Sequence, residues 1–138
     1  MKVSDVMERH VDFVESDVKV LDVARIIFGR RINGLPVCDS KKKVIGFISE
    51  SDILVKMHPT IREFAEDPLS SANFEGMEGK AKGVLELKAK EIMSKSPILV
   101  HEDDPLMKAD STMRIKDVGR LPVIDKNRKL VGIIAMGD

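Results

Sequence analysis

The sequence contains an internal repeat. Leu35-Pro36-Val37 returns as Leu121-Pro122-Val123, an offset of 121 − 35 = 86 residues. The same offset, applied without gaps, pairs residues along most of the chain: Met7 with Met93, Val14 with Val100, Asp39 with Asp125, Gly46 with Gly132, Ile48 with Ile134 and Asp52 with Asp138. Two copies of one supersecondary unit in a chain of 138 residues predict a pseudo-twofold pair whose apolar faces bury each other. We therefore expect a functional site in the crevice between the copies.

Composition narrows the class of protein. A chain with 43% hydrophobic residues can build one compact domain or two small units that share a core. Lys+Arg and Asp+Glu number 23 each, so no net field favours nucleic acid or an anionic membrane. No apolar run approaches the roughly 20 residues of a membrane helix, and the N-terminal residues 1–5 carry no apolar signal region. We therefore expect a cytoplasmic protein that binds neither nucleic acid nor membrane.

The residue pattern of each copy predicts a short strand, an amphipathic helix, and two strands joined by a polar turn. The helices show apolar residues at spacings of three and four: Val20, Val23, Ala24 and Ile27 in the first copy, and Leu106, Ala109 and Met113 in the second. Ser16-Asp17 is the expected N-cap of the first helix, and Asp104-Pro105 supplies the cap and first residue of the second. Residues 39–43 and 125–129 are the expected hairpin turns.

Two further features bear on the sheets. Pro36 and Pro122 cannot donate to a β-ladder, so each is expected in an edge strand or at a strand start. Cys38 follows in the same apolar run and has no partner for an internal disulfide, so we expect a buried strand residue.

Residues 58–88 connect the copies and predict some structure of their own. Residues 60–63 match a capping box ahead of a short helix, which Asp67-Pro68 would end. Gly76, Gly79 and Gly83 then favour a mobile segment. The chain should accordingly divide into a first repeat at 1–57, a connecting segment at 58–88 and a second repeat at 89–138.

The repeated motifs resemble the cystathionine-β-synthase (CBS) domain, which usually occurs in tandem as a Bateman module. The resemblance lies in Val6-Met7 and Ile92-Met93, the two Leu-Pro-Val-x-Asp segments, and Gly46-Phe47-Ile48-Ser49-Glu50-Ser51-Asp52. It implies an α/β fold of the α+β type, with two β-α-β-β-α repeats packed sheet to sheet as a pseudo-twofold pair. Because the sequence stops at Asp138, we expect the second repeat to lack its last helix. The resemblance also implies a homodimer that regulates another protein, which the sequence does not identify.

The resemblance further implies an adenine nucleotide (AMP, ADP or ATP) or S-adenosylmethionine in the cleft, with no cofactor required. In the family pattern Gly-h-h-Ser/Thr-x-x-Asp, where h is apolar, Asp52 would take the ribose hydroxyls and Ser49 would help hold ribose or phosphate. An ionised carboxylate suits this role because it accepts two hydroxyl donors. The alternative is that Ser51 or Asp52 only caps the helix that follows.

The second copy departs from this pattern. It keeps Asp138 but has Ala135 in place of the hydroxyl residue, which predicts weaker binding or none in the second cleft. Arg120, whose counterpart is Gly34, stands where nucleotide-sensing CBS pairs often carry an arginine directed at phosphate. The alternative for Arg120 is an ordinary surface ion pair with Asp117 or Asp125.

Three apolar residues, Val11, Ile32 and Val118, are candidates to flank an adenine ring, and the alternative for each is plain core. His10, His58 and His101 are far apart and form no metal-binding motif, and no nucleophile or phosphate-loop motif occurs. We therefore expect no metal site and no enzymatic activity. A second hypothesis is a ligand-free dimerisation module that binds a partner protein.

Overall fold

The computed structural model describes residues 1–58 and 74–136 and contains the two expected repeats. The elements of the first repeat are β1 (Val14–Glu15), α1 (Val20–Arg30), β2 (Gly34–Cys38), β3 (Val44–Ser49) and α2 (Glu50–Met57). Those of the second are β4 (Val100–His101), α7 (Leu106–Lys116), β5 (Arg120–Ile124) and β6 (Leu130–Ala135). A short helical segment precedes each repeat, the 3-10 helix η1 (Val3–Asp5) and α6 (Ala89–Ile92), and α5 (Phe74–Leu85) leads into α6. The predicted α+β architecture is confirmed.

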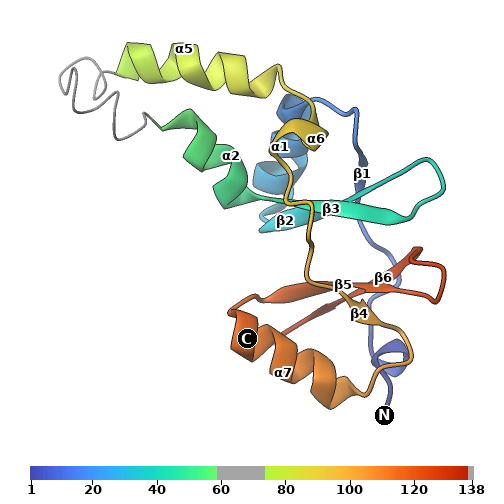
Figure 1. Ribbon diagram of the computed structural model, residues 1–138. Helices are drawn as coiled ribbons and strands as arrows, with labels where there is room; N and C mark the ends of the chain where they lie inside the picture. Colours follow the sequence, from blue (N-terminus) through green and yellow to red (C-terminus); the bar gives the residue numbers. More distant parts are fainter. Residues whose placement is uncertain (59–73, 137–138) are drawn as a thin grey trace.

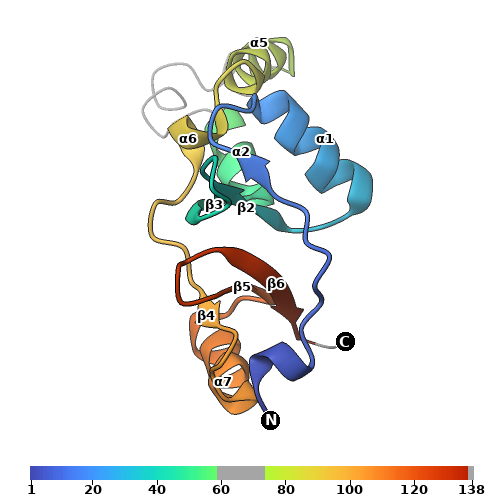
Figure 2. The same cartoon turned by 90° about the vertical axis from the view of Figure 1, so that its right-hand side faces the viewer.

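Each repeat forms a three-stranded sheet, ordered β1-β2-β3 and β4-β5-β6. In both sheets the first pair of strands is parallel and the second antiparallel, with equivalent registers: Val14 lies opposite Val37 as Val100 lies opposite Val123. The two sheets face each other across the middle of the molecule, with α1 and α2 on the far side of one and α7 on the far side of the other (Figures 1 and 2).

The proline-containing strands are central and neither proline begins its strand, so the expectation of an edge strand or a strand start for Pro36 and Pro122 is wrong. The reason is the shortness of β1 and β4. Strand β1 pairs with β2 only at Val37 and Cys38, so no ladder donor is required at Pro36. The same holds for β4, which pairs with β5 only beyond Pro122.

The apolar positions form a core within each repeat and a third cluster between them. The predicted stripe of α1 is buried throughout, as are Ala109 and Met113 on α7, while Leu106 is partly buried. Cys38 is buried as predicted and packs with Val44, Ile124 and Leu130 in the third cluster. The two hairpins also meet through their backbones, because Val44 N donates to Arg128 O at 3.1 Å and Leu130 N donates to Lys42 O at 3.0 Å.

The expected helix starts need correction. Helix α1 has Lys19 at its N-cap with no side-chain hydrogen bond. The residues predicted to cap it instead hold the segment around α6: Ser16 O accepts from Lys90 N at 3.0 Å, and Asp17 pairs with Lys90 Nζ at 3.0 Å. In the second repeat Pro105 is the N-cap, and Asp104 accepts from His101 N at 2.9 Å.

The described part of the connecting segment contains a helix that includes its glycines. Gly76, Gly79 and Gly83 all lie within α5, where the sequence predicted no helix. Packing explains the difference, because Val84 is buried in the core of the first repeat. The capping box expected at 60–63 and the helix end expected at 67–68 lie outside the described residues.

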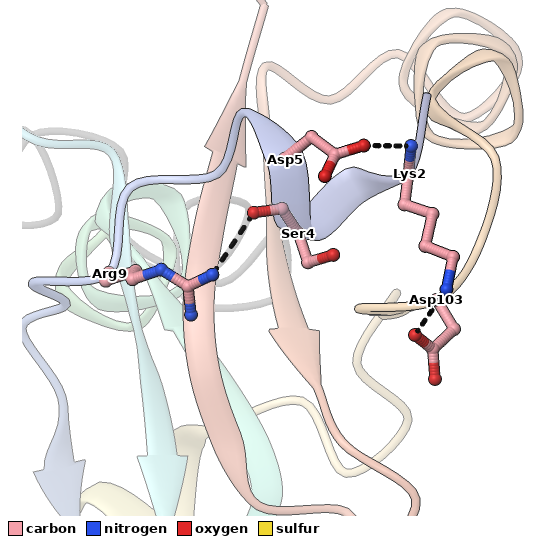
Figure 3. Close-up of polar contacts among 5 residues, drawn as sticks. All are labelled: Lys2, Ser4, Asp5, Arg9 and Asp103. Atoms are coloured by element: carbon pink, nitrogen blue, oxygen red, sulfur yellow. Dashed lines mark hydrogen bonds and ion pairs between the residues drawn. The ribbon is translucent and has the colours of Figure 1, made fainter.

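The opening segment of each repeat packs on the other repeat. Val3 N donates to Asp104 O and Glu8 N donates to Ile133 O, both at 2.9 Å. Around Ser4, the chain is held by Arg9 Nη2, which donates to Ser4 O at 3.3 Å, and an ion pair reaches the second repeat (Figure 3). That pair joins Lys2 Nζ to Asp103 at 3.4 Å.

The equivalent segment of the second repeat packs on the first in the same way. Ala89 N donates to Val18 O and Ser94 N donates to Phe47 O, both at 2.8 Å. Val3 and Met7 therefore belong to the core of the second repeat, and Ala89 and Ile92 to that of the first. The two repeats are thus joined by an exchange of their first segments.

Candidate functional site

Two cavities lie between the repeats. The first has a volume of about 600 Å³ and the second about 520 Å³. Gly34 and Arg120, which the 86-residue offset makes equivalent, are the first residues of β2 and β5 and line both cavities. The cavities therefore adjoin each other on either side of this pair.

The first cavity brings together four of the predicted site residues: Ser49, Asp52, Val118 and Arg120. Ser49 and Asp52 come from the junction of β3 and α2 in the first repeat. Val118 and Arg120 come from the turn into β5 in the second repeat. The cavity is thus walled by both copies, as the repeat predicts.

Ser49 and Asp52 form a capping box at the start of α2. Ser49 Oγ accepts from Asp52 N at 3.0 Å, and Asp52 Oδ2 accepts from Ser49 N at 2.9 Å. A helix cap is therefore present, but its N-cap residue is Ser49 and not Ser51 or Asp52. Asp52 completes the capping box from the third helical position, and the helix begins at Glu50 and not at Ile53. Within the described residues Asp52 Oδ1 has no hydrogen-bond partner, so one carboxylate oxygen remains for a ligand in the cavity.

Arg120 is half-buried at the boundary of the two cavities. Its guanidinium has no hydrogen bond or ion pair with any described residue, so the expected surface pair with Asp117 or Asp125 does not form. Asp125 instead accepts from Asn127 N at 2.8 Å and from Lys129 N at 2.9 Å in its own turn. The donors of Arg120 are therefore available to a ligand.

The second cavity holds the other two apolar candidates. Val11 and Ile32 line it, whereas Val118 lines the first, so the three cannot flank one ring. Each is only partly buried and also packs against a core cluster, so the core alternative holds beside the position in a cavity wall. Ala135 lines the second cavity at the position equivalent to Ser49, and Asp138 lies outside the described residues.

Sequence reasoning missed the contribution of the segment that follows α6. Ser94 and Ser96 line the first cavity, and the residues equivalent to them, Glu8 and His10, line the second. The offset itself links these positions, but nothing in the pattern places either pair at a cleft. The segment exchange brings them there.

Residues 1–58 and 74–136 contain no cluster of three or more His, Cys, Asp or Glu side chains arranged to hold a metal ion. Over the same residues, no helix combines the length and apolar character needed to cross a bilayer.

Comparison with known proteins finds one family throughout. The CBS domain family matches residues 3–59 and 89–138. An uncharacterised protein of Methanocaldococcus jannaschii, MJ1426, is 30% identical over 149 residues, which cover all of this chain and 88% of that protein. A homoserine O-acetyltransferase of Methanohalobium evestigatum is 29% identical over 136 residues, but this chain spans only 23% of that enzyme.

Solved structures share the fold. Protein MJ1225 of M. jannaschii superposes with a TM-score of 0.77 at 27% identity, covering 97% of this chain and 44% of that one. CBSX2, crystallised with AMP, gives a TM-score of 0.74 at 23% identity, covering 99% and 90% of the two chains. The CBS domain pair of protein MJ0100, crystallised with 5′-methylthioadenosine and S-adenosyl-L-methionine, gives 0.67 at 24% identity, covering 98% and 92%.

Proposed function

The chain belongs to the CBS domain family, and from this we propose that it is a regulatory module that binds an adenine nucleotide, AMP or ATP, in the first cleft between its repeats. The observation that carries the proposal is the convergence of Asp52 and Arg120, from different repeats, on one cavity of about 600 Å³. A carboxylate and a guanidinium that line one cavity from different repeats suit a ligand with vicinal hydroxyls and a phosphate.

Each group has a defined task in this proposal. Asp52 Oδ1 accepts a ribose hydroxyl while Oδ2 keeps its bond to Ser49 N, and Ser49 helps to orient the ribose or phosphate. Arg120 donates to the phosphate, because a planar guanidinium makes paired hydrogen bonds to phosphate oxygens. Val118 provides an apolar wall for the adenine. A ligand held this way fixes the relative orientation of the repeats, through which a regulated protein could sense it.

Related structures support an adenosyl ligand. CBSX2 was crystallised with AMP and the MJ0100 pair with 5′-methylthioadenosine and S-adenosyl-L-methionine. S-adenosylmethionine and ADP are therefore the other ligands to test. We further propose that the module acts in the cytoplasm as a homodimer and has no catalytic role of its own.

Isothermal titration with AMP, ADP, ATP and S-adenosylmethionine tests the proposal. We expect micromolar binding near one ligand per chain in the wild type and its loss in Asp52→Ala. Asp22→Ala is the matched control, because Asp22 is an exposed carboxylate that pairs with Arg25 on α1. Asp52→Asn, which can still accept from Ser49 N, separates loss of charge from loss of the helix cap. Unchanged binding in Asp52→Ala, or no binding by the folded wild type, would reject the proposal.

A second candidate is the ligand-free scaffold. Exposed apolar side chains on the outer helices favour it: Phe28 (46% exposed), Val55 (68%), Met107 (69%) and Ile115 (79%). This candidate predicts a stable dimer without nucleotide, measurable by light scattering, and no effect of Asp52→Ala on assembly.

A further inference from the structure

One guanidinium serves both cavities. Among the described residues that line them, Arg120 is the only lysine or arginine. The other ionisable residues are Glu50, Asp52 and Asp117 in the first cavity, and Glu8, His10 and Asp12 in the second. Asp12 is already paired with Arg30. A phosphate in either cavity therefore meets the same single guanidinium.

The equivalent position in the first repeat cannot supply a second cation. Gly34 lines both cavities, but a Cβ added there would lie 2.7 Å from Ile48 O and 2.5 Å from the Phe47 ring. Contact with backbone at that distance cannot be relieved by a rotamer change, so no side chain fits without a shift of β3. The asymmetry between Gly34 and Arg120 is therefore fixed by close packing of β2 against β3.

Apart from Gly34 and Arg120, the two cavities are lined by residues that suit different ligands. Where the first cavity has the hydroxyls of Ser94 and Ser96, the second has Glu8 and His10. Glu8 Oε1 accepts from His10 N at 3.0 Å, which leaves Oε2 to accept a ribose hydroxyl, while Val11 and Ile32 provide apolar contact. A nucleoside without phosphate meets acceptors and apolar walls there. Once a ligand in the first cleft engages Arg120, a phosphate in the second cleft would face the Glu8 carboxylate with no guanidinium to neutralise it.

We infer that the two clefts together hold at most one phosphorylated adenosyl ligand, which lies in the first cleft and binds Arg120. The second cleft accepts an adenosyl group that carries no phosphate. This inference rests on the proposed function. Two phosphates drawn to one guanidinium would repel each other at close range, where water screens charges poorly. The first ligand therefore disfavours a second anion without closing the second cleft.

Equilibrium dialysis of the wild-type chain with AMP, and separately with adenosine, tests the inference. We expect one AMP per chain but two adenosines, and one adenosine still bound when the chain is saturated with AMP. Arg120→Met keeps the length of the side chain and removes its charge. It should weaken AMP binding about ten- to hundredfold, the range for loss of hydrogen bonds to a charged group, and change adenosine binding less than about twofold.

The outcomes separate this inference from the proposed function. Two AMP sites of similar affinity in the wild type, or only one adenosine site, would overturn the inference and leave a single adenosyl site intact. So would an Arg120→Met chain that loses adenosine and AMP affinity equally. A wild type that binds neither compound would overturn the inference, and the absence of ATP binding as well would overturn the proposed function. Arg25→Met, an exposed arginine on α1, is the control for loss of a positive charge.

Discussion

At the scale of single residues, Cys38 illustrates how burial decides chemistry. Its side chain has no exposed surface, and burial raises the pKa of its thiol to about 11. The thiolate is the reactive form, so the folded protein should resist alkylation. We predict that iodoacetamide at pH 8 leaves Cys38 unmodified under native conditions and modifies it fully in denaturant, as measured by intact mass. Rapid labelling of the folded chain would contradict this assignment.

Ser49 caps α2 in addition to the ligand-binding role proposed for it, and the contribution of the cap can be measured without ligand. Its hydroxyl accepts from Asp52 N at 3.0 Å and caps α2. We predict that Ser49→Ala lowers the free energy of unfolding by about 1 kcal/mol, the usual cost of losing such a cap, in urea denaturation of the ligand-free chain. Ser51→Ala is the control, because Ser51 is exposed within the first turn and makes no cap. Equal stability of the two variants would argue against the cap.

At the scale of elements, α5 contains glycines that do nothing for its packing. A Cβ added at Gly79 or Gly83 would meet no atom within 4 Å, and neither residue has a positive φ. Glycine in a helix interior is less favourable than alanine by roughly 0.8–1.0 kcal/mol. We therefore predict that Gly79→Ala and Gly83→Ala each raise the free energy of unfolding by up to that amount, measured by chemical denaturation.

Gly46 is the contrasting control for that prediction. A Cβ there would lie 2.5 Å from Met93 Sδ and 2.8 Å from Ser94 O, where backbone must move. Gly46→Ala should therefore destabilise the chain. If all three substitutions changed stability in the same direction, the packing described for α5 or for β3 would be wrong.

Elements could be predicted from the sequence where burial follows a period, and less well where it does not. The stripe from Val20 to Ile27 identified α1 because every position in it faces the core. The glycines of α5 suggested mobility because local propensity does not reveal that Val84 packs into the first core. Pro36 suggested an edge strand because the sequence predicts a short β1 but does not show that it pairs with β2 only beyond Pro36. Tertiary packing decided both cases.

At the scale of the whole molecule, the offset predicted a crevice between the copies, whereas the two clefts were implied by the family resemblance and the residues of each by neither. It made Gly34 and Arg120 equivalent, yet only the three-dimensional arrangement shows both at the boundary of the two cavities. It could not separate Val11 and Ile32 from Val118, because a symmetric alignment does not say which copies meet at which cleft. The convergence of Asp52 with Arg120 followed from the family resemblance and not from the pattern of residues alone.

The exchange of first segments leads to a prediction that could not be made by aligning the two repeats. Met7 is buried in the core of the second repeat, with its Sδ 2.6 Å from where a Cβ on Gly132 would lie, and Ile133 N donates to Glu8 O at 2.8 Å. Met93 stands in the same relation to Gly46, and Phe47 N donates to Ser94 O at 3.0 Å. Each methionine therefore supports the repeat to which it does not belong in sequence.

Truncation of either side chain should loosen the opposite repeat. Met7→Ala should cost about 2–5 kcal/mol, as large-to-small core changes do, and Met93→Ala less because Met93 is only partly buried. In amide hydrogen exchange, we expect Met7→Ala to raise the exchange rates of Ile133 and the rest of β6 more than those of β3. Met93→Ala should raise the exchange rates of Phe47 and the rest of β3 more than those of β6. If each variant instead loosened the repeat that contains it in sequence, the repeats would be independent units, and a ligand between them would have no exchanged segment through which to couple them.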